Sequence, residues 1–212
     1  MYAKFIKQLI DFILSLLGII ILSPLLLILI ILGAIFMGGN PFFTQERPGY
    51  HEKIFKLIKF RTMDNRKDAN GDLLPDEVRL NKYGRFLRAS SLDELPELFN
   101  ILLGHMAIIG PRPLLVRYLP RYSDEQRHRH DVRPGLTGFA QAHGRNSLSW
   151  EDKFAMDVWY TRHVSFRTDM GIIIDTVRTV VKKEGISSET SATMEEFMGT
   201  PAGVEPTWRP PF

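Results

Sequence analysis

The chain of 212 residues has no cysteine, little net charge and only scattered histidines. The absence of cysteine excludes disulfides, a thiolate nucleophile and thiolate metal ligands, and it is consistent with a reducing compartment. The net charge of +3, from 27 basic and 24 acidic residues, gives no indication of nucleic-acid binding. Two of the six histidines lie close together, in "HRH" (128–130), and this stretch predicts a solvated basic turn rather than a metal site.

Charge is also absent from residues 12–37, which form an apolar run. As a helix rising about 1.5 Å per residue this run would be about 39 Å long, against about 30 Å for the hydrocarbon core of a bilayer. It is too long for the apolar part of a cleaved signal peptide, and no A-x-A-like site follows it. The segment is therefore predicted to lie in a membrane.

Ser23 and Pro24 fall near the middle of this run. Proline removes a backbone donor and kinks or breaks a helix, and a neighbouring serine can bond the freed carbonyl, which makes such a site tolerable in lipid. Basic residues flank the run on both sides: Lys4, Lys7, Arg47, Lys53, Lys56, Lys59 and Arg61. Because basic flanks stay in the cytoplasm, we expect a re-entrant helix–break–helix that enters and leaves by one face. A kinked single span is the alternative.

The remainder is predicted to be mostly α-helical with a few short strands. Residues 52–63 alternate charged and apolar groups, which fits a strand or a short helix, and we favour a strand at 54–60. Apolar spacing predicts helices at 77–90, 92–103, 150–164 and 168–183. The Ser-, Thr-, Pro- and Gly-rich residues from 186 onward are typical of a loosely ordered tail. We therefore expect three parts: a membrane anchor at 1–40, a compact domain at 41–185 and a tail at 186–212.

The stretch "SSLDELPELFN" (90–100) combines a leucine-rich face with an acidic one. On a helical wheel Asp93, Glu94 and Glu97 fall within an arc of about 100°. Carboxylates in a first turn are favoured by the helix dipole, and Ser91 with Glu94 fits a capping box. A solvated helix start is therefore the simpler interpretation of these residues.

Pro96 favours a second interpretation. It cannot donate to the carbonyl of Leu92, so that oxygen is expected to be free beside Asp93. One carbonyl with the carboxylates of Asp93 and Glu94 is the hard-oxygen set that Mg²⁺ uses. The same stretch therefore also predicts a divalent-metal site.

Several arginines lie in rigid sequence contexts further along the chain. Arg112 stands between Pro111 and Pro113, Arg133 precedes a Pro-Gly turn, and Arg145 lies in "HGRN". The planar guanidinium matches phosphate oxygens in a bidentate way. Metal-binding carboxylates, phosphate-binding arginines and a membrane anchor together suit phosphoryl transfer that involves a lipid. A carboxylate can also attack phosphorus to form a covalent intermediate.

These residues resemble the small monotopic phosphoglycosyl transferases, also called the bacterial sugar transferase family. The resemblance covers roughly residues 1–185, and the Ser-Pro pair in the apolar run is also similar to the family's re-entrant anchor. Six motifs carry it, in the family's order: "FTQERPG" (43–49), "KFRTM" (59–63), "SLDELPELFNIL" (91–102), "IGPRPLL" (109–115), "VRPGLTGFAQ" (132–141) and "GRNSLSW" (144–150).

The resemblance implies that a sugar-1-phosphate moves from a UDP-sugar to a polyprenyl phosphate, such as undecaprenyl phosphate, with release of UMP. This reaction initiates glycoconjugate biosynthesis. Asp93 would be the nucleophile of a ping-pong mechanism, and Glu94 would act with it at an Mg²⁺ site. The basic residues that would face the phosphates are Arg112, Arg145, Arg88, Lys59, Arg61 and Arg133.

The resemblance also implies a location. A monotopic enzyme would lie on the cytosolic face of the bacterial inner membrane, with amphipathic helices of a compact catalytic domain at the interface. It leaves open a homodimer and contacts with downstream glycosyl transferases.

The chain departs from the family pattern at a few positions. It has "HMA" (105–107) in place of Asp-Met-Ser, Phe139 in place of Trp, "QAHG" (141–144) in place of Val-Asn before Gly, and Glu97 where Gln is frequent. None of these is Asp93, Glu94 or one of the main arginines, so they bear on the sugar rather than on the reaction. The compact layout is closest to members that load an acetamido sugar such as diacetylbacillosamine.

Two other functions fit parts of the sequence. A membrane glycosyl transferase would move the sugar without its phosphate, but such enzymes often use an Asp-x-Asp motif, and "DNRKD" (64–68) has the wrong spacing. A non-catalytic scaffold would bind anionic lipid through the basic flanks, and it would not need Asp93.

Overall fold

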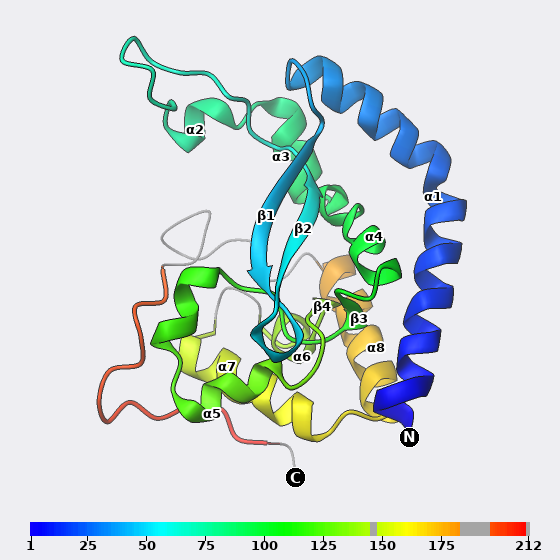
Figure 1. Cartoon of the computed structure of the whole chain (residues 1–212), viewed down its shortest axis with the longest axis vertical. Helices are drawn as coiled ribbons and strands as arrows, with labels where there is room; N and C mark the ends of the chain where they lie inside the picture. Colours follow the sequence, from blue (N-terminus) through cyan, green and yellow to red (C-terminus); the bar gives the residue numbers. More distant parts are fainter. Residues whose placement is uncertain (145–147, 183–195, 211–212) are drawn as a thin grey trace.

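The N-terminal apolar run folds as one continuous, bent helix. In the computed structural model, which describes residues 1–144, 148–182 and 196–210, α1 (Lys7–Phe36) follows a π-helical turn, η1 (Tyr2–Ile6), and contains Pro24. Pro24 cannot donate to the carbonyl of Ile20, and the Ser23 hydroxyl donates to that oxygen at 2.8 Å instead. Figure 1 shows the helix bent along one side of the molecule. The expected break is thus corrected to a bend, which a proline inside a helix explains.

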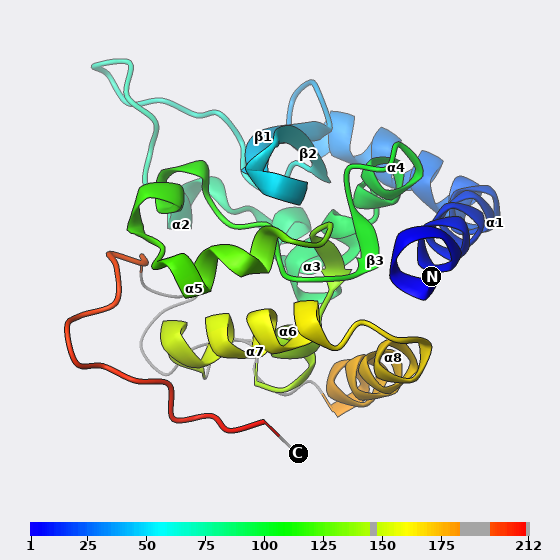
Figure 2. The same cartoon turned by 60° about the horizontal axis from the view of Figure 1, so that its bottom comes forward.

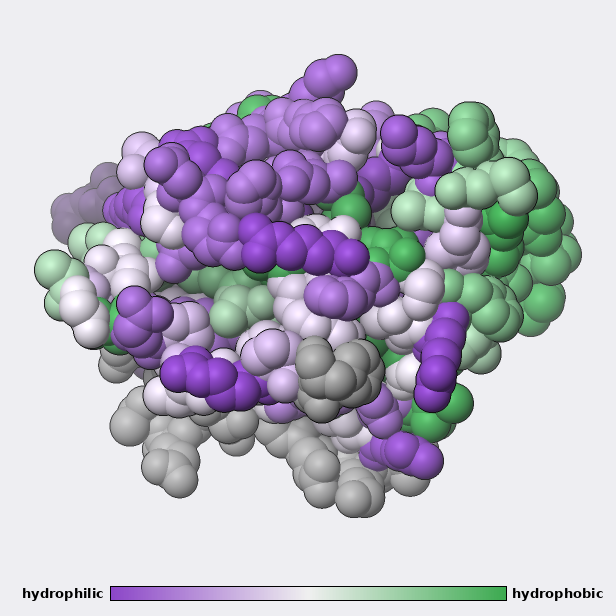
Figure 3. Space-filling view, turned by 90° about the horizontal axis from the view of Figure 1, so that it is seen from below, coloured by the Kyte–Doolittle hydropathy of each residue, from purple (hydrophilic) through white to green (hydrophobic). Residues whose placement is uncertain are grey.

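The two sides of α1 differ in an unusual way. The side turned to the protein buries six residues: Lys7, Asp11, Ser15, Leu26, Leu29 and Gly33. The outer side exposes apolar residues, among them Ile21, which is 72% exposed. The helical stretch Tyr2–Phe36 is the one candidate membrane span among the described residues, by length and composition. In Figure 3 apolar residues gather along the side of the molecule where α1 lies.

Both ends of α1 are held by the rest of the protein. Near the N-terminus, Lys7 Nζ is 3.1 Å from Asp169 Oδ2, and the Tyr2 hydroxyl donates to the same oxygen at 2.7 Å. Near the C-terminal end, Asn81 Nδ2 donates to the carbonyl of Phe36 at 3.1 Å. The two ends of the apolar helix therefore contact the same globular part.

The rest of the described residues fold into helices and two pairs of strands, which confirms the mostly helical prediction. β1 (Phe42–Pro48) and β2 (Ile54–Phe60) form an antiparallel hairpin, and β2 coincides with the strand expected at 54–60. β3 (Ala107–Ile109) and β4 (Gly135–Thr137) form a parallel pair. The remaining helical segments in chain order are η2 (Tyr50–Glu52), α2 (Asp76–Arg79), α3 (Lys82–Ala89), η3 (Leu92–Glu94), α4 (Glu97–Leu102), η4 (Val116–Arg121), α5 (Asp124–Arg127), η5 (His128–His130), α6 (Phe139–Ala142), α7 (Trp150–Arg162) and α8 (Phe166–Lys182).

The leucine-rich face of α4 packs between β2 and α1, as Figure 2 shows from one end. The shared core contains residues of α4, β2, α1 and the segment before β3: Leu98, Ile101, Phe55, Leu57, Ile19, Leu22 and Met106. Burying such side chains is the main favourable term in folding, at about 1.5–3 kcal/mol for each large one. The position of α4 is therefore fixed relative to both the anchor and the hairpin.

Asn100 adds a polar contact to this packing. Its side chain accepts from the Ile58 amide at 2.9 Å and donates to the Lys56 carbonyl at 2.8 Å, and the residue is 1% exposed. An asparagine amide carries both a donor and an acceptor, so it completes the edge of β2 as a neighbouring strand would. This contact fixes the position of the next residue, Lys59, relative to α4.

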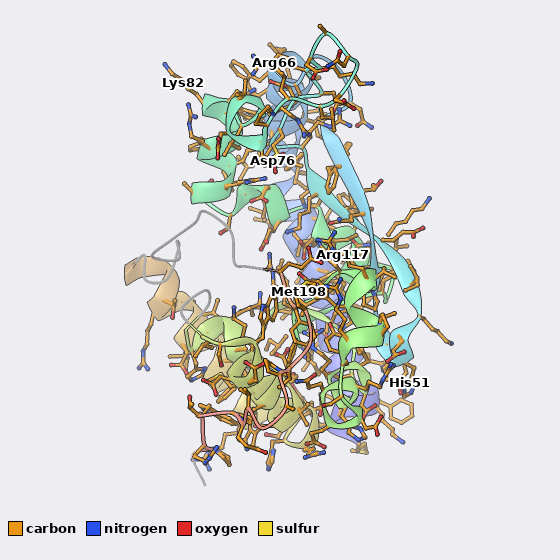
Figure 4. All side chains as sticks on the ribbon, turned by 90° about the vertical axis from the view of Figure 1, so that its left-hand side faces the viewer. His51, Arg66, Asp76, Lys82, Arg117 and Met198 are labelled. Atoms are coloured by element: carbon orange, nitrogen blue, oxygen red, sulfur yellow. The ribbon has the colours of Figure 1, made fainter. Side chains whose placement is uncertain are left out.

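Residues 196–210, which lie in the segment expected to be loosely ordered, pack against the helices around α7. Phe197 is 1% exposed and lies in a core with Tyr118, Tyr122 and Phe154. Further along, the Trp208 amide donates to the carboxylate of Asp152, in the first turn of α7, at 2.8 Å. In Figure 4 Met198 and Arg117 lie near the middle of the molecule, while His51 marks the far tip of the hairpin and Arg66, Asp76 and Lys82 mark the opposite end.

Candidate active site

The acidic pair lies in a tight turn rather than within a helix. Ser91 adopts the left-handed conformation, with φ 55°, and its side chain makes no capping bond. The chain then forms the 3₁₀ turn η3, and α4 starts only after Pro96. The Leu92 carbonyl accepts from the Leu95 amide at 3.3 Å. The predicted capping box, the free carbonyl and the single helix at 92–103 are therefore wrong, because a left-handed residue turns the chain just before the carboxylates.

Lys59 lies at the centre of a group of charges that comes from three elements. Its Nζ is 2.7 Å from Glu94 Oε1 and 3.0 Å from Glu97 Oε1. From the loop after β3, Arg112 Nη2 reaches the same Glu94 oxygen at 2.8 Å. The Glu97 side chain is 3% exposed, whereas the Arg112 side chain is 46% exposed. The cluster thus has a buried base and an open side on which the guanidinium meets solvent.

Asp93 is the carboxylate of this cluster that has no direct partner. Within the described part of the chain its side chain makes no hydrogen bond and no ion pair. Burial and the neighbouring charge of Glu94 raise its pKa, and the positive charges of Lys59, Arg112 and Arg88 only partly oppose that rise. A carboxylate that is surrounded by cations yet bonded to none can attack an electrophile or bind a metal.

Glu94 and Glu97 are in different states from Asp93. Burial acts to raise the pKa of Glu94, but Arg112 and Lys59 outweigh it and lower that pKa to about 2. The pKa of Glu97 is raised by its burial and by the charge of Glu94, although Lys59 is close. Glu94 therefore stays ionised at neutral pH and holds the two cations beside Asp93.

Arg88 reaches the cluster because α3 packs very closely on the end of β2. A Cβ at Gly84 would lie 1.8 Å from the carbonyl oxygen of Thr62, so only glycine allows this approach. Arg88 Nε then donates to the Thr62 hydroxyl at 3.1 Å. Its charge is among those that lower the pKa of Asp93.

The other predicted basic residues are distributed differently. Arg133 lies beside α1, where its Nη2 is 3.5 Å from Gln8 Oε1, and it is not among the charges with the largest effect on the pKa of Asp93. Arg61, half-buried after β2, is also not among those charges. Arg145 lies outside the described residues. Of the predicted set, the structure therefore brings Lys59, Arg88 and Arg112 to the acidic pair.

Comparison with known proteins identifies the family of the chain. A family model described as bacterial sugar transferase matches residues 2–183. The chain belongs to the bacterial sugar transferase family. The resemblance drawn from the six motifs is thereby confirmed.

Individual relatives of this sugar transferase extend the comparison. This chain is 52% identical over 164 residues to a Bacillus subtilis protein named uncharacterized sugar transferase EpsL. The alignment covers 77% of this chain and 81% of the relative. The chain is 32% identical over 200 residues to the undecaprenyl-phosphate galactose phosphotransferase of Salmonella typhimurium, covering 86% of this chain and 42% of the relative. It is 36% identical over 181 residues to the UDP-glucose:undecaprenyl-phosphate glucose-1-phosphate transferase of Klebsiella pneumoniae, covering 81% and 39%. The chain thus spans most of the first relative and less than half of the other two.

The donor set of the sugar transferase fits a magnesium ion that is held partly by substrate. No group of three metal-binding side chains occurs among the described residues. The Asp93 carboxylate has no bonded partner in the part of the chain that the structure describes, and Glu94 uses Oε1 for both of its cations. Mg²⁺ usually keeps several waters and binds through one or two carboxylates together with substrate phosphates. Two carboxylates with spare oxygens therefore suffice for such an ion.

Several polar residues that are buried in the sugar transferase were missed by sequence reasoning, among them Asn100, Arg129 and Asp157. Asn100 could have been found as the polar position within an apolar helix face. Arg129 and Asp157, which form an ion pair at 2.7 Å, are far apart in sequence and gave no signal. Arg129 and His130 are 2% and 5% exposed, so the prediction of a solvated turn at "HRH" is wrong for these two residues, whereas the side chain of His128 is exposed. Arg129 folds inward to pair with Asp157 of α7, and His130 packs against the ring of Tyr122.

Proposed function

We propose that this sugar transferase moves a sugar-1-phosphate from a UDP-sugar to a polyprenyl phosphate by way of a covalent intermediate on Asp93. The observation that carries the proposal is the carboxylate of Asp93, which has no bonded partner among the described residues although Lys59, Arg88 and Arg112 act on it. The names of the Salmonella and Klebsiella relatives support transfer of a sugar phosphate to undecaprenyl phosphate.

The reaction would have two displacements at one phosphorus. A carboxylate oxygen of Asp93 attacks the β-phosphorus of the donor, the bond from that phosphorus to the bridging oxygen breaks, and UMP leaves with the electron pair. An oxygen of the polyprenyl phosphate then attacks the same phosphorus, and the Asp93 carboxylate is released. Arg112 and Arg88 would bind the phosphate oxygens, because guanidinium groups match them and offset their charge.

Asp93 and Glu94 would hold Mg²⁺ together with the substrate phosphates, and the ion would neutralise charge on the diphosphate. Lys59 would keep Glu94 oriented, since its Nζ bonds that side chain directly. Glu94 thus serves the site as an ionised carboxylate, while Asp93 remains available for attack.

A re-entrant anchor in the bacterial inner membrane, with the catalytic part on the cytosolic face, agrees with the contacts of α1. Both ends of the helix contact the same globular part, through Lys7 at one end and Phe36 at the other. Basic residues flank the helix on both sides, which favours the cytoplasm for both flanks. The acetamido-sugar subtype stays a prediction, since the relatives named above carry galactose or glucose in their names.

Incubation of the purified enzyme with a UDP-sugar in the absence of lipid acceptor tests the covalent step. We expect a burst of about one UMP per enzyme and a mass increase equal to one sugar phosphate, carried by the peptide that contains Asp93. Asp93→Asn should abolish both, whereas Asp72→Asn, in an exposed loop, should leave both unchanged. A burst without enzyme-bound sugar phosphate, or a labelled peptide elsewhere, would refute the intermediate.

The same assay with undecaprenyl phosphate separates the alternative functions. Release of UMP with a lipid diphospho-sugar supports the proposal, release of UDP identifies a glycosyl transferase, and no release with any UDP-sugar leaves a lipid-binding scaffold. A panel of UDP-sugars in this assay would also identify the sugar.

Cysteine labelling tests the anchor, because the chain has no cysteine of its own. Single variants Ala3→Cys and Asp72→Cys should both react with an impermeant maleimide only after the cells are opened. Reaction of Ala3→Cys in intact cells would show that α1 crosses the membrane once.

A further inference from the structure

In segment 111–113, Pro-Arg-Pro, each backbone carbonyl accepts a hydrogen bond. Three donors from three parts of the chain bind the three successive oxygens: the Gly135 amide at 3.0 Å, Arg129 Nη2 at 2.8 Å and Arg47 Nη1 at 3.2 Å. The two prolines have no N–H of their own. The orientation of this segment therefore depends on what its carbonyls accept.

Arg129 makes the shortest of these three bonds, and it is the carbonyl of Arg112 itself that accepts it. The same Nη2 donates to Asp157 Oδ2 at 2.7 Å, and Nε donates to that oxygen at 3.2 Å. Arg129 is 2% exposed and Asp157 is 5% exposed. The rigid guanidinium thus connects a buried carboxylate on α7 to the backbone of the residue that reaches Glu94.

The surroundings of Arg129 restrict it further. Its guanidinium lies 5.8 Å from the ring centre of Tyr122 and 5.5 Å from that of Phe154. Phe197, from the C-terminal segment, packs against both of these rings. A buried ion pair contributes little net stability compared with well-packed apolar residues. The ion pair of Arg129 and Asp157 is therefore better explained by the orientation that it gives to the guanidinium than by its contribution to stability.

We propose that Arg129, oriented by Asp157, is a positioning residue for Arg112: it fixes the backbone of Arg112 so that the guanidinium points at Glu94 and the substrate phosphates. The catalytic consequence rests on the proposed function, whereas the positioning itself does not. Glu94 holds the tip of the Arg112 side chain at 2.8 Å, and Arg129 holds its backbone carbonyl at 2.8 Å, so the two contacts together set the direction of the guanidinium. A lysine at position 129 would keep the charge but not the planar fork that binds the carboxylate and the carbonyl together.

Arg129→Lys tests this proposal, and the chain offers a closely matched control. Arg127 also binds one carboxylate, Glu52 at 2.7 Å, and one backbone carbonyl, that of Leu119 at 3.0 Å. Arg127→Lys therefore makes the same chemical change two residues away without touching Arg112. Turnover, measured as UMP release, should fall between about 10- and 100-fold in Arg129→Lys, as a misplaced binding group causes, and should be unchanged in Arg127→Lys.

A double-mutant cycle separates positioning from a general effect on folding. If Arg129 acts through Arg112, then Arg129→Lys should cost less than about twofold in turnover when it is added to Arg112→Lys. An equal loss in both backgrounds would overturn the proposal. If Arg129→Lys does not yield folded protein, Arg47→Lys, which acts on the next carbonyl, enters the same cycle with the same expectations.

The ¹⁵Nε resonance of Arg112, assigned by its loss in Arg112→Lys, gives a readout that does not need turnover. It should shift in Arg129→Lys and stay in place in Arg127→Lys. An unmoved resonance in Arg129→Lys would overturn the positioning role. If the unmodified enzyme releases no UMP from any UDP-sugar, the proposed function fails, and the resonance alone decides the positioning.

Discussion

Replacing Asn100 with alanine should loosen the strand that carries Lys59. The change leaves the Ile58 amide and the Lys56 carbonyl without the partners they have at 2.9 and 2.8 Å. An orphaned backbone group costs about 1–3 kcal/mol, and because these two are only partly buried we expect about 2–3 kcal/mol for the pair. In a chain of this size that corresponds to a fall of about 5–10 °C in unfolding temperature.

Asn100→Asp separates the two bonds. The aspartate can still accept from the Ile58 amide, but its second oxygen would face the Lys56 carbonyl, so a donor is replaced by a repulsive contact. We expect a loss at least as large as that of Asn100→Ala. Asn70→Ala, in an exposed loop, is the control and should change the free energy of unfolding by less than about 0.5 kcal/mol.

Thermal unfolding of the detergent-solubilised protein, followed by tryptophan fluorescence, measures all three variants. Turnover should fall with stability in both Asn100 variants, because Lys59 loses its fixed position beside Glu94. If Asn100→Ala unfolds at the same temperature as Asn70→Ala, then the side chain does not hold the edge of β2, and the account of how Lys59 is placed is wrong.

Three further predictions concern the turn and the packing around Asp93. Burst release of UMP should decline on acidification at a higher pH than the ordinary aspartate pKa of about 3.9, because the attacking form is ionised and burial raises the pKa of Asp93; a decline at or below the ordinary value would contradict this. Ser91→Gly should raise the free energy of unfolding in urea by about 0.5–1 kcal/mol, since glycine adopts a positive φ without strain, and a destabilised variant would count against it. Gly84→Ala should cost about 3 kcal/mol through overpacking against Thr62, whereas Gly171→Ala, with open space around it, should cost nothing measurable in the same melts.

Much of the fold could be predicted from periodicity, because it is local. The strand at 54–60 and the helices α7 and α8 lie where apolar spacing put them. The bond from the Ser23 hydroxyl to the backbone carbonyl that Pro24 leaves without a donor was also expected, since it needs only neighbouring residues. A pattern that spans a few residues determines these features.

The geometry of the site depended on distant contacts and could not be predicted in the same way. A left-handed Ser91 has no sequence signature, and it overrides a well-matched capping box. The pairing of Arg129 with Asp157 joins residues 28 positions apart. Asp93, Glu94 and Arg112 could be singled out by their chemistry, but the burial of Arg129 could not, because that depends on which helix folds behind it.

The inverted polarity of α1 makes the anchor and the enzyme a single folding unit. Truncation before residue 41 would strip Asp169 of its countercharge from Lys7 and of the Tyr2 hydroxyl, and it would open the cores that Leu22 and Leu29 help to close. In the shortened chain Asp169 would have no countercharge from Lys7, and two hydrophobic clusters would be exposed to solvent. Such a chain would aggregate. A water-soluble form of this enzyme should instead keep α1 and replace its exposed apolar residues, such as Ile21, with polar ones.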